Sequence, residues 1–399
     1  MAESSEEPQS TGRNIALLLG CEALVRTTAI INLTTMALIG RQLAPQAAFA
    51  TLPLALVSVA TVLCTVPAAR LMRRRGRALG FSLGASGGLV GALLCAWAVF
   101  RGDFGLLCLG AVFLGALNGS ATYHRFAAAE AASEAFRSRA LSLVLAGGVV
   151  AAFLGAFLAT QSRGLFPATP AAGAFACIAA LMGLYLLMMA FTSLPRARAE
   201  ELGGEGRSLK ELLRQPRLVA AVLGSALSWG LMALLMNVTP LSMERHHHAF
   251  SDTALVIQWH VLGMYVPSFF TGHLVRLWGE GRVIFAGLAL FLASVLFNLA
   301  GHELLHYSIG LTLLGLGWNL LFIGSTSLLT LSHRPEEKTR VQSFNDMLVF
   351  VAMVLATSGA GPIEDHLGWH ALNLYTLPLL GAATLALAFL LSRPSPKRD

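Results

Sequence analysis

The sequence predicts an all-α membrane protein in which twelve transmembrane helices form two halves of six. Three observations support this fold class. Of the 399 residues, 55% are hydrophobic and only 12% are charged, whereas charged residues make up about a quarter of a soluble domain. Hydrophobic stretches of about 20 residues, long enough to cross a bilayer, recur along the chain. A long polar segment, residues 195–216, separates the first six stretches from the last six.

The predicted spans define the domain organisation. An N-terminal bundle occupies residues 14–194 and a C-terminal bundle residues 219–391, joined by a polar linker over 195–218. Polar tails cover residues 1–13 and 392–399, and because the first tail is acidic we expect no cleavable signal peptide. The twelve spans lie at residues 14–40, 46–69, 79–100, 104–124, 140–162, 170–194, 219–243, 252–273, 281–301, 304–330, 343–361 and 370–391.

The basic residues gather on one side of this arrangement. If both termini lie in the cytoplasm, 23 of the 28 Lys and Arg residues fall in the tails, the linker and the loops on the cytoplasmic side. This distribution follows the positive-inside rule of membrane proteins. It therefore predicts cytoplasmic termini and a cytoplasmic linker. It also accounts for the net charge of +7 without a nucleic-acid partner.

The two halves share short motifs at matching positions. The segment ARLMRRRGR (69–77) follows the second span, and GHLVRLWGE (272–280) follows the eighth; both read small-x-Leu-x-Arg-x-x-Gly. In the fourth and tenth spans, FLGALNG and LLGLGWN place Gly115 opposite Gly315. An internal repeat of six helices is therefore expected, because such repeats are typical of transporters.

These repeated motifs resemble those of the major facilitator superfamily. The resemblance implies two six-helix bundles with the substrate near the membrane midplane, exposed alternately to each side. In that superfamily the loop after the second span carries an acidic residue, but here the corresponding positions are Arg73 and Arg276. The ion pair that the acid makes in the superfamily is therefore not expected at these loops.

Two spans in the second half carry residues suited to a soft metal ion. Met232 and Met236 in the seventh span, and His260 and Met264 in the eighth, are each one helical turn apart and share a helix face. Thioether sulfur suits Cu(I), imidazole is a versatile partner, and an ionisable group within a span is a functional candidate. Packing of methionine against lipid or protein is the alternative. We expect the two spans to face one another as sequential neighbours.

Histidines also lie in the predicted outer loops. Three of them, His246, His247 and His248, follow the seventh span and are candidates for metal recruitment, with a solvated polar turn as the alternative. HELLH (His302–His306) matches a zinc-protease pattern. Its place in a short turn between spans argues against a protease, so an outer metal contact or interfacial polar residues are the remaining interpretations.

Charged groups within spans are candidates for gating or coupling. Glu22 and Arg26 in the first span are one helical turn apart, and a buried charge is costly unless it is paired. A structural ion pair, a substrate contact and a coupling site all remain open for this pair. Asp346, at the inner end of the eleventh span, is a candidate for an inner gate.

Aromatic and amide side chains offer a different kind of site. Trp229, Trp259 and Trp318 fall in the seventh, eighth and tenth spans, and Asn319 follows Trp318. Indole faces can stack on a planar organic molecule, whereas interfacial anchoring is the alternative for tryptophan in a membrane protein. These four residues form the predicted pocket for an organic substrate.

The paired Met and His residues resemble the copper-binding signature of the CcoA-like copper importers, a branch that also contains bacterial riboflavin transporters. The segments from Tyr123 to Gly155 and from Glu336 to Phe350 are similar to that branch as well. The resemblance implies a multi-pass carrier of the bacterial inner membrane, expected to act as a monomer without catalytic residues or a resident cofactor. Copper import for oxidase assembly is the leading interpretation, and riboflavin or another planar molecule is the alternative cargo.

Overall fold

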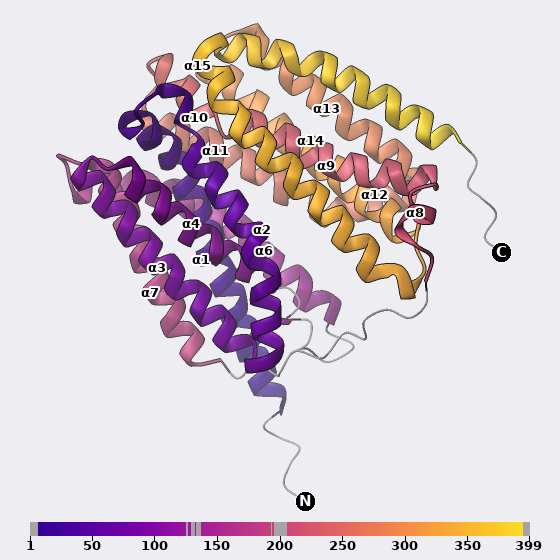
Figure 1. Cartoon of the computed structure of the whole chain (residues 1–399), viewed down its shortest axis with the longest axis horizontal. Coiled ribbons are helices and arrows are strands. Elements are labelled where there is room, and N and C mark those ends of the chain that lie inside the picture. The colour runs from indigo at the N-terminus through magenta and orange to yellow at the C-terminus, as the bar shows by residue number, and fades with distance from the viewer. Residues whose placement is uncertain are drawn as a thin grey trace, which may run out of the picture. The chain divides into compact units, whose positions relative to one another are not determined.

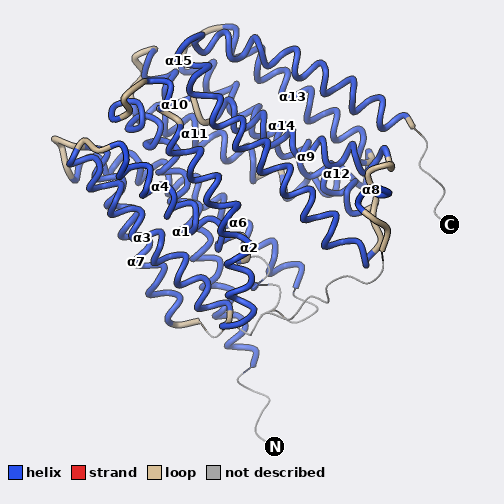
Figure 2. Tube along the Cα trace, viewed as in Figure 1, coloured by secondary structure: helices blue, strands red, loops and turns tan. Residues whose placement is uncertain are grey.

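The computed structural model describes residues 7–393 except residues 125–126, 129–131, 133–136, 193 and 195–205, and the side chains of residues 7–11, 137–146, 335 and 339. All regular elements in this described part are helices (Figure 2). The outermost tail residues and residues 195–205 of the predicted linker lie outside it. The chain divides into two compact units, Met1–Ala199 and Glu200–Asp399, which are considered separately below.

The described part of the first unit contains six long helices (Figure 1). Within it, α1 packs against α6 and α7, α3 against α4 and α7, and α2 against α4. Short 3-10 turns cover Ala47–Phe49 and Ser162–Leu165. The helices are α1 (Glu7–Leu43), α2 (Leu52–Arg75), α3 (Arg77–Arg101), α4 (Phe104–Ala121), α6 (Arg137–Gln161) and α7 (Pro170–Ala190).

The helices of the second unit are more often interrupted and vary more in length (Figure 1). Here α14 packs against α13, α11 and α9, and α9 also packs against α15. A 3-10 turn, η3, covers Pro335–Glu337. The helices are α8 (Leu209–Leu212), α9 (Pro216–Met236), α10 (Thr239–Arg245), α11 (Phe250–Tyr265), α12 (Ser268–Trp278), α13 (Glu280–Ala300), α14 (Leu304–Thr330) and α15 (Lys338–Ser392).

The helices account for the predicted membrane spans. In the described residues, ten helices are long and apolar enough to cross a membrane, and the pair α11–α12, bent by 42°, makes eleven. The 55-residue α15 contains Gly368 in a non-helical conformation (φ 77°). A continuous helix of that length would be about 80 Å long, more than twice the hydrocarbon core of roughly 30 Å. Figure 1 shows α15 as two segments that reverse direction, so it supplies two crossings and brings the total to twelve.

Two of the predicted spans are broken near prolines. The seventh span divides into α9, which ends at Met236, and α10, in which Pro240 occupies the first turn. The eighth span divides into α11 and α12, with Pro267 as the residue before α12. Proline lacks the backbone N–H that a helix interior requires, and it is tolerated in the first turn. The two prolines therefore explain why each span is interrupted at this point.

The glycines that the sequence repeat aligned have the same structural role in both units. A Cβ atom on Gly115 of α4 would collide with the carbonyl oxygen of Val57 on α2. Likewise, a Cβ atom on Gly315 of α14 would collide with the carbonyl oxygen of His260 on α11. Small residues allow helix backbones in membranes to approach closely. The repeat detected in sequence thus corresponds to one equivalent helix crossing in each unit.

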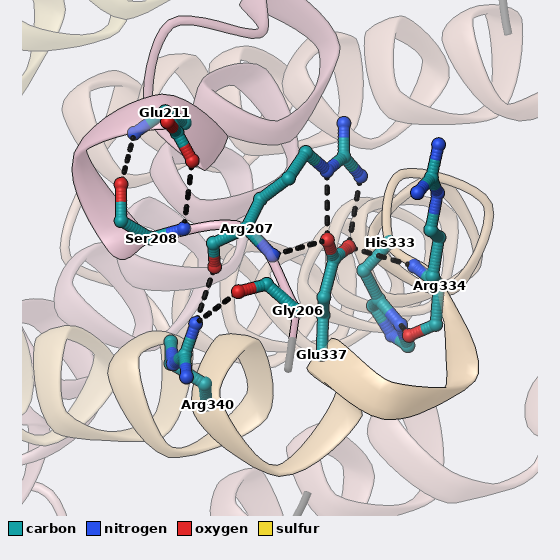
Figure 3. A network of polar contacts seen from close by, with 8 residues as sticks. All are labelled: Gly206, Arg207, Ser208, Glu211, His333, Arg334, Glu337 and Arg340. Carbon is teal, nitrogen blue, oxygen red and sulfur yellow. Dashed lines mark hydrogen bonds and ion pairs between the residues drawn. The ribbon is translucent and has the colours of Figure 1, made fainter. Parts of the chain in front are cut away.

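An ionic cluster ties the segment before α9 to the start of α15 (Figure 3). The guanidinium of Arg207 donates two hydrogen bonds to the carboxylate of Glu337, at 2.7 and 2.8 Å. Arg340 donates to the backbone carbonyl of Arg207, while Ser208 and Glu211 form a reciprocal capping box at α8. Hydrogen bonding to Arg207 lowers the pKa of Glu337 to about 2. The ion pair therefore persists at neutral pH and is lost only as the pH falls toward that value.

Candidate functional site

A chain of polar side chains is buried within the first unit. On α1, Arg26 Nε donates to Glu22 Oε1 at 2.7 Å. The other carboxylate oxygen, Oε2, accepts a hydrogen bond from Nδ1 of His124 at 2.7 Å, and Nε2 of His124 lies 2.7 Å from the hydroxyl of Tyr185 on α7. The exposed fractions of Glu22, His124 and Tyr185 are 3%, 0% and 1%. The predicted Glu22–Arg26 pair is therefore real, and it belongs to a longer chain of four residues.

Sequence reasoning missed two members of this chain, His124 and Tyr185. Each is a polar aromatic residue at or within a predicted span, which was the available signal. The packing of α1 against α7 brings Glu22 and Tyr185 to the same region. Phe81 of α3 covers the imidazole of His124, with ring centroids 4.6 Å apart. The chain thus has apolar surroundings in which each hydrogen bond is strengthened and each unpaired charge is costly.

An aromatic cluster lies in the second unit. Trp229 of α9 meets Trp318 of α14 edge to face, with ring centroids 5.0 Å apart. One turn further along α14, Phe322 stacks on Trp318 at 5.2 Å and meets Trp229 at 5.9 Å. The Nε1 atom of Trp318 is buried and has no hydrogen-bond partner within the described residues. The cluster therefore packs indole and phenyl rings together beside one buried N–H donor that has no partner among the described residues.

Trp259 does not join this cluster, contrary to the predicted pocket. Its side chain is 48% exposed, whereas the adjacent His260 is completely buried. Consecutive residues of a helix point in different directions, so burial of His260 against α14 turns Trp259 away from it. Trp259 therefore lies on the surface of its unit.

Asn319 makes its hydrogen bonds at the break between α11 and α12. Its Nδ2 atom donates to the carbonyl oxygen of Met264 at 2.7 Å and lies 2.6 Å from Oγ of Ser268. Its Oδ1 accepts a hydrogen bond from the hydroxyl of Thr271 at 2.5 Å. These contacts satisfy polar groups where Pro267 interrupts the eighth span, as neighbouring side chains do at broken membrane helices. Asn319 therefore has a structural role at this break, and its predicted pocket role stays a prediction.

The Met and His pairs do not lie on helices that face each other. Met232 and Met264 are buried, and Met236 is half-buried. The helices that carry the pairs, α9 and α11, each pack on α14 and do not pack extensively on one another. Consecutive helices of a bundle need not be spatial neighbours, so this part of the expectation was wrong. Whether the four side chains meet in another conformation stays a prediction.

His260 is held by α14 through one ring nitrogen. Its Nδ1 atom donates to the carbonyl oxygen of Leu311 at 2.8 Å. The other nitrogen, Nε2, is buried and has no hydrogen-bond partner in the described part of the chain. Because Nδ1 is the donor, a neutral ring leaves Nε2 as an unprotonated acceptor. This is the atom that a metal ion or a ligand donor would approach.

The histidines after α10 contact a neighbouring turn. The ring of His246 stacks on that of His302 with centroids 4.0 Å apart, and Nε2 of His248 donates to the carbonyl oxygen of His302 at 2.7 Å. His247 is exposed and has a positive φ of 61°. Within the described residues, no group of three or more His, Cys, Asp or Glu side chains is arranged to hold a metal ion. Metal recruitment by these histidines is therefore unsupported by a preformed site.

The HELLH stretch straddles the start of a helix. His302 precedes α14, Glu303 is its N-cap residue, and the helix begins at Leu304, so His306 lies in the first turn. The zinc-protease pattern requires both histidines on one helix face. This geometry removes the protease interpretation.

Asp346 lies on the exposed surface near the start of α15. Its Oδ1 accepts a hydrogen bond from the side chain of Asn345 at 3.2 Å. A gating role for this residue stays a prediction.

Both units consist of membrane-crossing helices, and each contains a buried polar or aromatic cluster. The described residues include no sizeable domain outside the membrane. These features define a multi-pass membrane transporter. A family model described as "Major Facilitator Superfamily" matches residues 15–258 and 221–399. The chain belongs to this superfamily of secondary transporters. It is therefore a carrier of small solutes and not an enzyme.

Similarity to individual proteins refines this assignment. The chain is 35% identical over 387 residues to "Riboflavin transporter RfnT" of Brucella anthropi, covering 96% of each chain. Among solved structures, it is similar to an auto-inhibited POT family peptide transporter, with a TM-score of 0.75 at 14% identity over 97% of this chain and 98% of that one. It is also similar to the xylose transporter XylE from E. coli, with a TM-score of 0.70 at 15% identity over 98% and 99%. The structural likenesses show the fold alone.

Proposed function

We propose that this protein imports riboflavin, or another small planar organic molecule, across the bacterial inner membrane by alternating access. The observation that carries the proposal is the cluster of Trp229, Trp318 and Phe322, in which aromatic faces lie beside the buried indole N–H of Trp318. The isoalloxazine ring of a flavin has flat apolar faces and carbonyl oxygens on its edge. The 35% identity to a riboflavin transporter over 96% of the chain supports the same cargo.

The chemistry of the cluster fits such a ring. Stacking of a planar base on an aromatic side chain contributes about 1–3 kcal/mol, as measured by alanine substitution. A buried N–H without a partner costs about 1–3 kcal/mol, which a ligand carbonyl would recover. Both contributions favour a planar ligand with acceptors on its edge over a small ion.

Copper is the second candidate cargo. The buried Nε2 atom of His260, which lies one helical turn from Met264, favours it. Against it, the two Met and His pairs are on helices that pack on α14 rather than on one another. The two cargoes therefore predict different sets of sensitive residues: the tryptophans for riboflavin, and Met236 with His260 for copper.

Uptake in cells that lack their own carriers tests the proposal. We expect Trp318→Ala to reduce uptake of labelled riboflavin by roughly 5- to 150-fold, the equivalent of one lost stacking contact. Trp259→Ala is the matched control, because its indole is exposed and outside the cluster, and it should transport normally. Uptake that survives Trp318→Ala, with copper uptake lost in the Met236→Ala, His260→Ala double variant, would establish copper as the cargo instead.

The orientation of the carrier follows from its basic residues. We propose that both termini and the linker face the cytoplasm, because 23 of 28 basic residues then lie inside. Single cysteines at Ser5, Gly204 and Ser395, in a background without the five natural cysteines, should resist a membrane-impermeant thiol reagent in intact cells. Labelling of any of the three from outside would contradict this orientation.

A further inference from the structure

Three buried polar side chains of α1 have no hydrogen-bond partner for their oxygen atoms among the described residues. Thr28, Asn32 and Thr35 are 3%, 6% and 1% exposed, and the side-chain oxygens of all three are unpaired. A buried polar atom without a hydrogen bond costs free energy, so native proteins contain few of them. Three such atoms on one helix therefore require an explanation, which the stacking of a planar ring in the second unit does not provide.

The two threonine hydroxyls differ from others in the helices of this protein. A helical threonine can satisfy its hydroxyl by donating to a backbone carbonyl about one turn earlier in the same helix. Thr34 of α1 does so, with Oγ1 2.8 Å from the carbonyl oxygen of Ile30, and Thr61 of α2 donates in the same way. Thr28 and Thr35 make no such bond. Their hydroxyls are therefore left for a partner that does not belong to the helix.

The three side chains form one stripe along α1. Each member follows the previous one after about one helical turn, so they share a helix face and span about 10 Å along the axis. Gly155 of α6 packs on Ile30 of α1. Because Ile30 is two residues, or roughly 200° of helical rotation, from both Thr28 and Asn32, the stripe lies on the side of α1 away from α6. Thr27 also has an unpaired hydroxyl, but it lies about 100° around the helix and outside the stripe.

A row of neutral oxygen atoms suits a linear polyol better than a metal ion. A hard cation requires several oxygens that converge on one point at about 2.5 Å, whereas the stripe spreads its oxygens over about 10 Å. Hydroxyl and amide groups both donate and accept hydrogen bonds, and so do the successive hydroxyls of a polyol. Riboflavin carries such a polyol, the ribityl chain, on its ring. A bare planar molecule has no group of this kind to offer.

We infer that the stripe of Thr28, Asn32 and Thr35 binds the ribityl chain of the cargo, so that the carrier selects a flavin bearing this polyol over a bare planar ring. This role rests on the proposed riboflavin cargo and adds the part of the molecule that the stripe recognises. The stripe is closed to solvent in this conformation, and a carrier that works by alternating access opens its binding residues in another. Because the polyol supplies the missing hydrogen bonds, its binding favours the conformation in which the stripe is open.

Binding of two flavins to the purified full chain tests this role. Lumiflavin has the ring of riboflavin with a methyl group in place of the ribityl chain, and quenching of flavin fluorescence gives the Kd of each. We expect wild-type protein to bind riboflavin at least about tenfold more tightly than lumiflavin. Asn32→Leu, and the double variant Thr28→Val, Thr35→Val, should weaken riboflavin binding by roughly 2- to 12-fold for each lost hydrogen bond, while the Kd of lumiflavin changes by less than about twofold.

Thr34→Val is the matched control, because it removes a hydroxyl that already bonds to its own helix, and it should leave both Kd values at the wild-type level. The stripe variants should have denaturation midpoints equal to or above that of the wild type, since apolar groups of similar shape replace unpaired polar ones. A lowered midpoint, unchanged riboflavin binding, or equal weakening of both flavins in these variants would overturn the polyol site, as would equal wild-type affinity for the two flavins. Wild-type protein that binds neither flavin would instead refute the flavin cargo, and the polyol site would fall with it.

Discussion

Replacing Gly315 by alanine is expected to destabilise the second unit by about 1–3 kcal/mol or more, the usual cost of overpacking a tight core. The added Cβ atom would collide with the carbonyl oxygen of His260, and it would lie 3.0 Å from the backbone nitrogen of Met264 and 3.1 Å from the backbone carbon of Gly263. All three atoms belong to the backbone of α11, so no side chain can move aside. The midpoint of thermal denaturation of the solubilised protein measures the effect.

The other glycines provide the controls for this prediction. Gly115→Ala should cost a similar amount, because its Cβ would meet the backbone of α2 at Val57 and Thr61. Gly183 on α7 has no atom within 4 Å of its would-be Cβ, so Gly183→Ala should be neutral or slightly stabilising, since alanine favours helix by about 1 kcal/mol. Equal denaturation midpoints for Gly315→Ala and Gly183→Ala would show that the α11–α14 crossing tolerates expansion.

The features that the sequence predicted well are those with a local origin. Span length follows from the thickness of the bilayer, and the Glu22–Arg26 contact follows from the geometry of one helical turn. The break near Pro240 follows from a missing backbone donor, whereas the break near Pro267 was recognised only in the structure. The match of Gly115 with Gly315 reflects the internal repeat. Apart from the repeat, each of these is readable within a few residues of the chain.

The features that the sequence could not predict depend on which helices become neighbours. His124 and Glu22 are 102 positions apart, and the contact between them requires the packing of the whole first unit. The apolar faces of membrane helices resemble one another, so hydropathy does not specify the order of helices in a bundle. This is why α9 and α11 were expected to face each other, although α14 is the common neighbour of both.

Because helix neighbours could not be predicted, the sequence alone favoured copper over a planar cargo. Paired Met and His residues are visible in a linear pattern, whereas the Trp229–Trp318 contact joins α9 to α14 and appears only in three dimensions. The sequence therefore favoured the copper interpretation. The assembled aromatic cluster and the similarity to a riboflavin transporter favour the planar cargo.

Replacing Glu22 by glutamine is expected to reduce uptake of labelled riboflavin strongly and to lower the amount of folded protein. The amide keeps the size of the side chain and can still accept a hydrogen bond from His124, but it removes the negative charge that faces Arg26. Breaking a fully buried pair in this way costs about 3–5 kcal/mol. Because the side chain of Arg26 is 37% exposed, solvent reduces the penalty, and we expect about 1–2 kcal/mol. Thermal denaturation and vesicle uptake measure the two effects separately.

The double variant Glu22→Gln, Arg26→Gln separates folding from transport. Removing both charges takes away the uncompensated cation that the single variant leaves, so the denaturation midpoint should recover toward that of the wild type. Uptake of labelled riboflavin should stay lost, because the carboxylate that contacts both Arg26 and His124 is still missing. If the double variant accumulates riboflavin normally, the Glu22–Arg26 pair only supports the fold.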